Sequence, residues 1–116
     1  MATTALILFV IAALGGLVLA GFHFSKRPLP TSLALLHGAL AATGLVFLIL
    51  TVIRSTTAGP LGLSLGILVV AALGGFILFS SHLRKRALPT PLVLIHAAAA
   101  VAGVVILLIW VLDQKV

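Results

Sequence analysis

The sequence predicts an all-α integral membrane protein, a bundle of four transmembrane helices produced by tandem duplication of a two-helix hairpin. The first observation behind this prediction is composition: 63% of the residues are hydrophobic, whereas soluble domains are about 45–50% apolar. The mean hydropathy, +1.44, points the same way. The second observation is an internal repeat, because about half of residues 13–53 are identical to the residue 59 positions later.

Four apolar runs are each about 20 residues long, the length that a helix needs to cross a hydrocarbon core of about 30 Å. The predicted helices run from Ala5 to Ser25, Ser32 to Ile53, Leu61 to Ser81 and Pro91 to Leu112. Short connections make neighbouring helices antiparallel. Residues 1–56 form the first hairpin and residues 57–116 the second, together one membrane domain. Two helices per repeat preserve orientation, so we expect a parallel repeat with a pseudo-two-fold axis along the membrane normal.

The connections carry signals for helix ends. Lys26 and Arg27 stand just before two prolines, and residues that precede proline leave the helical region, so the first helix is expected to end there. Thr31 and Thr90 are the expected N-caps of the second and fourth helices. Residues 57–60, Thr-Ala-Gly-Pro, are expected to break the chain between the two halves.

The basic residues predict the topology. Seven Lys and Arg accompany one acidic residue. Five of them lie in the first and third connections, at Lys26, Arg27, Arg84, Lys85 and Arg86, and two lie on the other side, at Arg54 and Lys115. By the positive-inside rule, loops 26–30 and 84–89 are cytoplasmic and both termini are outside, as expected for a bacterial inner-membrane protein. Topology accounts for the charge, so no nucleic-acid partner is expected.

Several chemistries are excluded by residues that the chain lacks. It has no cysteine, which removes thiolate metal sites and cysteine nucleophiles. Its one carboxylate side chain, Asp113, stands at the outer end of the last helix, so no Ser-His-Asp constellation can form. A small proton-coupled transporter is a third choice at most, because no carboxylate lies within a span. We do not expect an independent enzyme.

Four histidines occupy equivalent positions in the two halves, each with a glycine seven residues nearer the membrane centre. The pairs are Gly16 with His23, Gly44 with His37, Gly75 with His82, and Gly103 with His96. Seven residues make about two helical turns, so each glycine is expected on the face of its histidine and about 10 Å deeper. All four helices would then present an imidazole above bare backbone.

The two pairs of histidines differ in expected depth. His37 and His96 lie about six residues inside their helices, where an ionisable side chain marks a functional site that faces the interior. A neutral imidazole bonded to a neighbouring Ser or Thr is the structural alternative. His23 and His82 lie about one turn from the basic loops, and they fit a basic rim in contact with lipid headgroups equally well.

Haem b explains more of this pattern than a bare metal ion does. It takes two axial imidazoles, the glycines leave room for a flat ring, and four cations can pair with its propionates: Lys26, Arg27, Lys85 and Arg86. In an up-down-up-down square His37 and His96 lie on diagonal helices, so they are the expected iron ligands, with His23 and His82 as a supporting pair. Separate haems in a splayed bundle remain the alternative. Bound lipid, quinone or carotenoid is also compatible with the pattern.

Helices with an interior histidine, a glycine further along and a basic loop at the end resemble those of bis-histidine b-type membrane cytochromes. The matching residues are His37-Gly38 with Gly44 and His96-Ala97 with Gly103. The resemblance is to a class and is confined to these helices. It implies haem b and the transfer of single electrons between quinols, soluble donors and acceptors. The chain departs from the class in having its histidines near one face only.

A structural function is the rival prediction. Small apolar chains with short loops serve as accessory subunits of larger respiratory or photosynthetic membrane complexes. Gly15-Gly16, Gly74-Gly75 and the alanine run would then be close-packing faces. On either interpretation the expected partners are the lipid bilayer and either other membrane subunits or a second copy of the chain.

Overall fold

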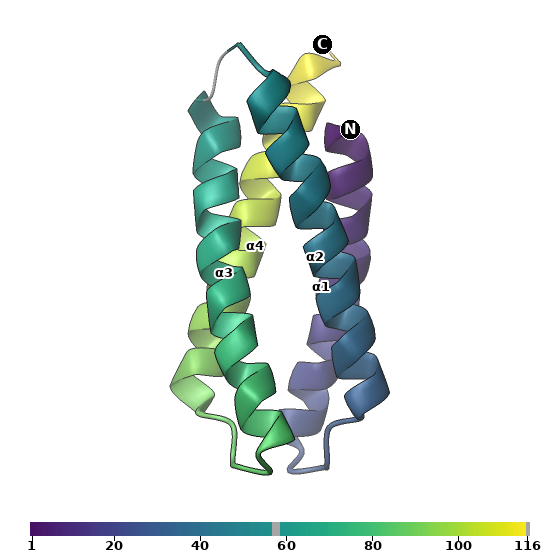
Figure 1. Cartoon of the computed structure of the whole chain (residues 1–116), viewed down its shortest axis with the longest axis vertical. Coiled ribbons are helices and arrows are strands. Elements are labelled where there is room, and N and C mark those ends of the chain that lie inside the picture. The colour runs from purple at the N-terminus through teal and green to yellow at the C-terminus, as the bar shows by residue number, and fades with distance from the viewer. Residues whose placement is uncertain (57–58, 116) are drawn as a thin grey trace.

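The computed structural model describes residues 1–56 and 59–115, which form a bundle of four antiparallel helices (Figure 1). The helices are α1 (Ala2–Phe24), α2 (Thr31–Arg54), α3 (Gly59–Leu83) and α4 (Thr90–Gln114). Each is long and apolar enough to cross a membrane. The all-helical fold with four such helices is therefore confirmed, and no predicted end differs from the observed one by more than three residues.

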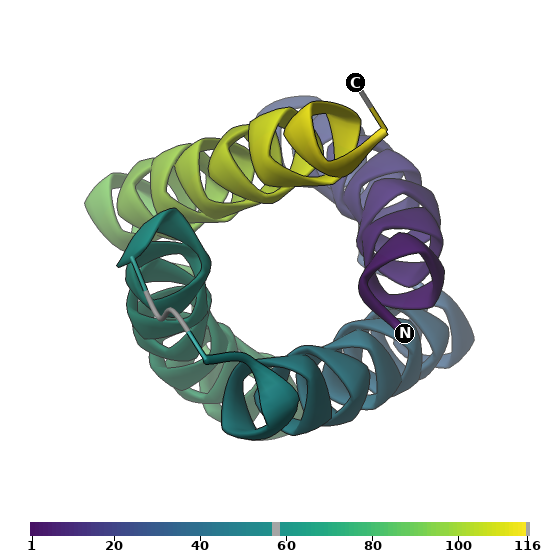
Figure 2. The same ribbon diagram turned by 90° about the horizontal axis from the view of Figure 1, so that it is seen from above.

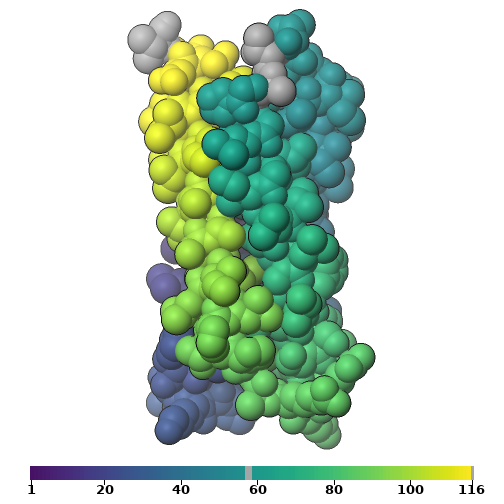
Figure 3. All heavy atoms as spheres, turned by 90° about the vertical axis from the view of Figure 1, so that its left-hand side faces the viewer, coloured from purple at the N-terminus to yellow at the C-terminus, as the bar shows by residue number. Residues whose placement is uncertain are grey.

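The bundle is elongated, 44 Å long and 19 by 18 Å across, and its helices stand at the corners of a square in cross-section. Helix α1 packs closely on α2 and α3 on α4, with lesser contacts between α1 and α4 and between α2 and α3. Figure 2 shows that α1 and α3, like α2 and α4, lie on diagonals. Figure 3 shows α3 and α4 side by side along one face. Both termini lie at one end of the bundle, the terminal end, and loops 25–30 and 84–89 lie at the other, the basic end.

The fully packed core lies toward the terminal end. It combines residues of all four helices: Ala5, Phe9, Leu48, Leu61, Leu68, Leu107 and Val111. Two glycines make this packing close: a Cβ on Gly44 would lie 3.3 Å from the ring of Phe9, and one on Gly103 would lie 2.5 Å from Leu68 Cγ. This end therefore holds the two hairpins together through apolar contact.

The outward faces of the helices are also apolar. Leu17 and Phe76 are each 70% exposed and Ile53 is 73% exposed. Burying such side chains from water is worth roughly 1.5–3 kcal/mol each. An outer surface of this kind is what lipid would cover.

Two expectations about helix ends are corrected. Helix α1 ends at Phe24, and the chain then turns through Lys26 at a φ of +58°, as it does through Lys85 at +55°. Pro30 and Pro89, not Thr31 and Thr90, are the N-caps of α2 and α4, and no side chain caps either helix, because the two threonine hydroxyls bond to histidines instead. Of the predicted break at 57–60, Gly59 and Pro60 already belong to α3, and residues 57–58 lie outside the described part.

Candidate functional site

The two central histidines are held in equivalent ways. His37 Nδ1 lies 2.7 Å from the backbone oxygen of Ala12 on α1, and His96 Nδ1 lies 2.7 Å from that of Ala71 on α3. A carbonyl oxygen only accepts hydrogen bonds, so each Nδ1 carries the proton and donates. In a neutral ring Nε2 is then left with a free lone pair. The partners are backbone groups, not the Ser or Thr of the structural alternative.

These imidazoles meet on the axis of the bundle. The ring centroids of His37 and His96 are 6.1 Å apart and the ring planes are at 84°. The rings come from α2 and α4, the diagonal helices, as the up-down-up-down arrangement predicts. Within residues 1–56 and 59–115 neither Nε2 has a hydrogen-bond partner. The two unpaired nitrogens therefore belong to neighbouring rings that are partly buried.

Two of the four glycines lie against a histidine of the neighbouring helix. Gly16 lies against His37, where an added Cβ would be 2.9 Å from Cε1, and Gly75 lies against His96 at 3.1 Å. Each glycine thus serves the histidine of the next helix, because antiparallel neighbours bring residues from different turns to one level. Gly44 and Gly103 lie deeper, and their bare backbone is already covered by Phe9 and Leu68. Open backbone beside an imidazole is found at Gly16 and Gly75.

The outer histidines connect the two hairpins. His23 Nε2 on α1 lies 3.1 Å from Thr90 Oγ1 on α4, and Thr31 Oγ1 on α2 lies 2.9 Å from His82 Nε2 on α3. The sequence reasoning missed both threonines as partners and assigned them to helix caps. Thr31 and Thr90 are 59 residues apart, as His23 and His82 are, and this shared spacing could have indicated that the threonines and histidines are partners.

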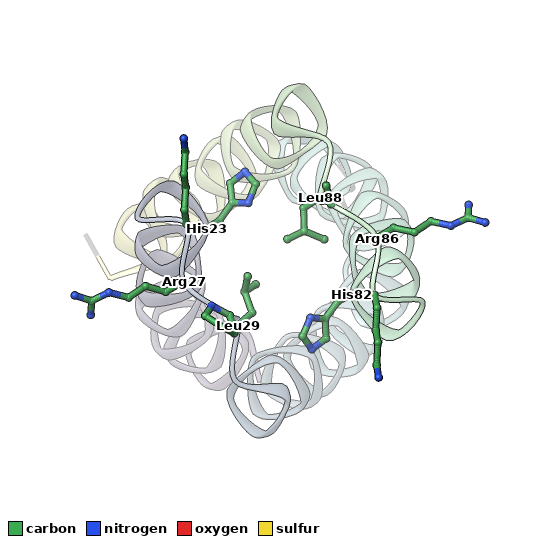
Figure 4. Close-up of a pocket in the computed structure, with 10 residues that line it drawn as sticks. His23, Arg27, Leu29, His82, Arg86 and Leu88 are labelled. Atoms are coloured by element: carbon green, nitrogen blue, oxygen red, sulfur yellow. The ribbon is translucent and has the colours of Figure 1, made fainter.

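A cavity of about 470 Å³ opens at the basic end between the two loops. Its lining comes in equivalent groups from the two hairpins: His23, Lys26, Arg27, Pro28 and Leu29, with His82, Lys85, Arg86, Ala87 and Leu88. Figure 4 shows His23, His82, Leu29 and Leu88 pointing into the opening, while Arg27 and Arg86 point away from the axis. The inner wall is therefore imidazole and leucine, and the two arginines lie on the outside.

The donor set fits haem better than a bare metal ion. No group of three or more His, Cys, Asp or Glu that could hold a metal occurs in the described ranges, whereas a zinc site takes three or four protein ligands. Haem iron needs only two axial ligands from the protein. His37 and His96, with ring centroids 6.1 Å apart, are the residues that would hold such a group.

The two pairs of imidazoles and the cavity are thus the features from which a function can be inferred. Each hairpin contributes one histidine to each pair and an equivalent group of residues to the cavity lining. Comparisons of the chain with protein-family models, with curated proteins and with solved structures found no match.

Proposed function

We propose that the chain spans a membrane and binds b-type haem between His37 and His96, so that it carries single electrons. Four sufficiently long apolar helices support the membrane assignment. Basic loops at one end support a cytoplasmic position for that end, and a bacterial inner membrane is the location we propose. Equivalent contacts of His37 and His96 with Ala12 and Ala71 support a tandem duplication with parallel repeats.

One observation carries the haem assignment: two imidazoles from diagonal helices lie 6.1 Å apart with both Nδ1 atoms bonded to backbone carbonyls. Ligating histidines characteristically donate their other N–H to such a group, which sets the tautomer and makes the ligating nitrogen more basic. Bound haem would supply an iron that gains and loses one electron.

The chain would contribute position and environment. The carbonyls of Ala12 and Ala71 hold each ring, and both belong to helices packed tightly on the helix of the histidine. Gly16 and Gly75 keep the side of each ring free of a Cβ. The neighbouring residues offer no carboxylate to balance added charge, which an apolar interior disfavours.

The test is a visible spectrum of the protein purified in mild detergent, before and after reduction by dithionite and after addition of haemin. We expect a low-spin spectrum that disappears in His37→Ala and His96→Ala. His23→Gln and His82→Gln are the matched controls and should keep it. Protein that stays colourless after haemin addition would rule out the proposal, and a spectrum that survives loss of His37 would move the ligands to the outer pair.

The same preparation separates this proposal from the rival one. An accessory subunit would be colourless and would co-purify with one large membrane complex. Its central imidazoles would then serve only to join α2 to α1 and α4 to α3 through the carbonyl bonds. A haem-binding chain can also belong to a complex, so pigment, not co-purification, decides between the two.

A further inference from the structure

The two hairpins are joined by different means at the two ends of the bundle. At the terminal end all four helices contribute to the apolar core, and the chain passes from the first hairpin to the second between Arg54 and Gly59. At the basic end a cavity of about 470 Å³ separates loops 25–30 and 84–89. No covalent connection between the hairpins exists at this end.

Two polar contacts bridge the hairpins at the basic end, and we refer to them as the histidine–threonine contacts. One joins His23 to Thr90 and the other joins Thr31 to His82, at 3.1 and 2.9 Å. Each takes one residue from the first hairpin and one from the second. They therefore hold together the end that the apolar core does not reach.

Both loops at the basic end carry positive charge. The first loop carries Lys26 and Arg27 and the second carries Arg84, Lys85 and Arg86, all exposed. The one acidic side chain of the chain, Asp113, lies near the terminal end. Like charges on two facing loops repel, and salt screens the repulsion beyond about 10 Å at 0.1 M. Loops 25–30 and 84–89 thus offer no ion pair that would hold the hairpins together at this end.

The cavity stops before it reaches the central imidazoles. Neither His37 nor His96 belongs to its lining. Gly16 touches His37 and lies seven residues from His23 along α1, which is about 10 Å of helix. Ala20 stands between these levels, on the same face of α1. A ligand that enters from the basic end would therefore pass His23, His82 and Ala20 before it reaches the central pair, which is partly buried.

We propose that the basic end is a gate to the central imidazoles: the hairpins swing apart there about the core of the terminal end, and the histidine–threonine contacts hold the gate closed. The proposal goes beyond the proposed function, because it concerns access to His37 and His96 and not the identity of their ligand. It also gives His23 and His82 a function that does not require them to bind metal.

The chain has no cysteine, so a single Ala20→Cys substitution reports on access. We would measure the rate at which a charged methanethiosulfonate reagent modifies this thiol, with Thr31→Val and Thr90→Val added together. Loss of two hydrogen bonds is expected to raise the rate about tenfold. The matched control is Thr43→Val with Thr51→Val, whose hydroxyls bond to carbonyls of their own helix. An unchanged rate, or an equal rise in the control, would overturn the gate.

A second experiment does not depend on the threonine variants folding well. His23→Cys with Thr90→Cys, joined by a short reducible thiol cross-linker, should close the gate permanently. We expect slower amide hydrogen exchange in residues 16–23, restored when the linker is reduced. Exchange that is the same in both states would overturn the proposal. Neither experiment uses haem, so a colourless protein would refute the proposed function and leave the gate to be judged by these rates.

Discussion

The terminal end and the basic end of this bundle use the same repeat in opposite ways. At the terminal end the two copies differ: Phe9 fills the space over Gly44, whereas Leu68 fills the space over Gly103. At the basic end the same polar contact occurs in both halves, with histidine bonded to threonine twice. Apolar packing needs the right volume and tolerates a change of side chain. Hydrogen bonding needs particular atoms, which explains why the same polar pair stands at both equivalent positions.

This difference indicates that the terminal end stabilises the bundle, whereas the imidazole layer is available to bind a ligand. The terminal end has the buried core, in which side chains of both hairpins pack together. The layer of His37 and His96, nearer the basic end, has fewer buried side chains and two free Nε2 atoms. Substitutions at the terminal end should therefore change stability, and substitutions at the imidazole layer should change ligand binding as well.

The largest effect on stability is expected for Gly103→Ala. Its Cβ would lie 2.5 Å from Leu68 Cγ and 2.7 Å from Cδ2, and overpacking of this kind costs about 2–3 kcal/mol. Gly66→Ala is the control, because nothing lies within 4 Å of its Cβ position. Unfolding in mixed micelles with increasing dodecyl sulfate measures both. Equal midpoints for the two variants would show that Leu68 moves aside freely.

Gly16→Ala tests the imidazole layer and should cost about 1–2 kcal/mol, since its Cβ would lie 2.9 Å from Cε1 of His37. That ring cannot turn away without losing its bond to Ala12. We also expect a weakened low-spin haem spectrum, an effect that Gly103→Ala should not share. Gly21→Ala, with open space around it, is the control for helix propensity. A Gly16→Ala protein with unchanged haem binding would contradict the close fit.

A stabilising change is expected at the basic end. Lys26 occupies the left-handed region at a φ of +58°, and replacing it by glycine should remove a strain of about 1 kcal/mol. Lys26→Ala is the control, because it loses the same charge and keeps the strain. The difference between the unfolding midpoints of Lys26→Gly and Lys26→Ala measures the backbone strain at this position. No difference would indicate that the turn relaxes around alanine.

The smallest effect is expected for Ser64→Ala. Ser64 is fully buried and donates to the backbone oxygen of Gly103 at 2.8 Å, and such bonds within helical membrane proteins average about 0.6 kcal/mol. Thr43→Val is the control, since that exposed hydroxyl bonds within its own helix. If Ser64→Ala costs as much as Gly103→Ala, the polar contact would matter more than packing at this end.

Much of the fold followed from local properties. Apolar length predicted four helices, and short connections predicted that His37 and His96 lie on diagonal helices. The threonine assignment was wrong, because an N-cap is a local rule and Thr31 found its partner His82 on another helix. The contacts of Gly16 with His37 and of Gly75 with His96 were not predicted, since spacing along one helix does not give the level of the next.

Sequence by itself determined the number of helices, their apolar character, the repeat and the separation of charge to one end. These depend on hydropathy and chain length, which each segment carries alone. Only the tertiary structure decided that Ala12 and Ala71 hold the central imidazoles, that the rings lie 6.1 Å apart and that two histidine–threonine contacts bridge the hairpins. Those relations depend on the relative height and rotation of neighbouring helices, which side-chain packing sets when the bundle forms.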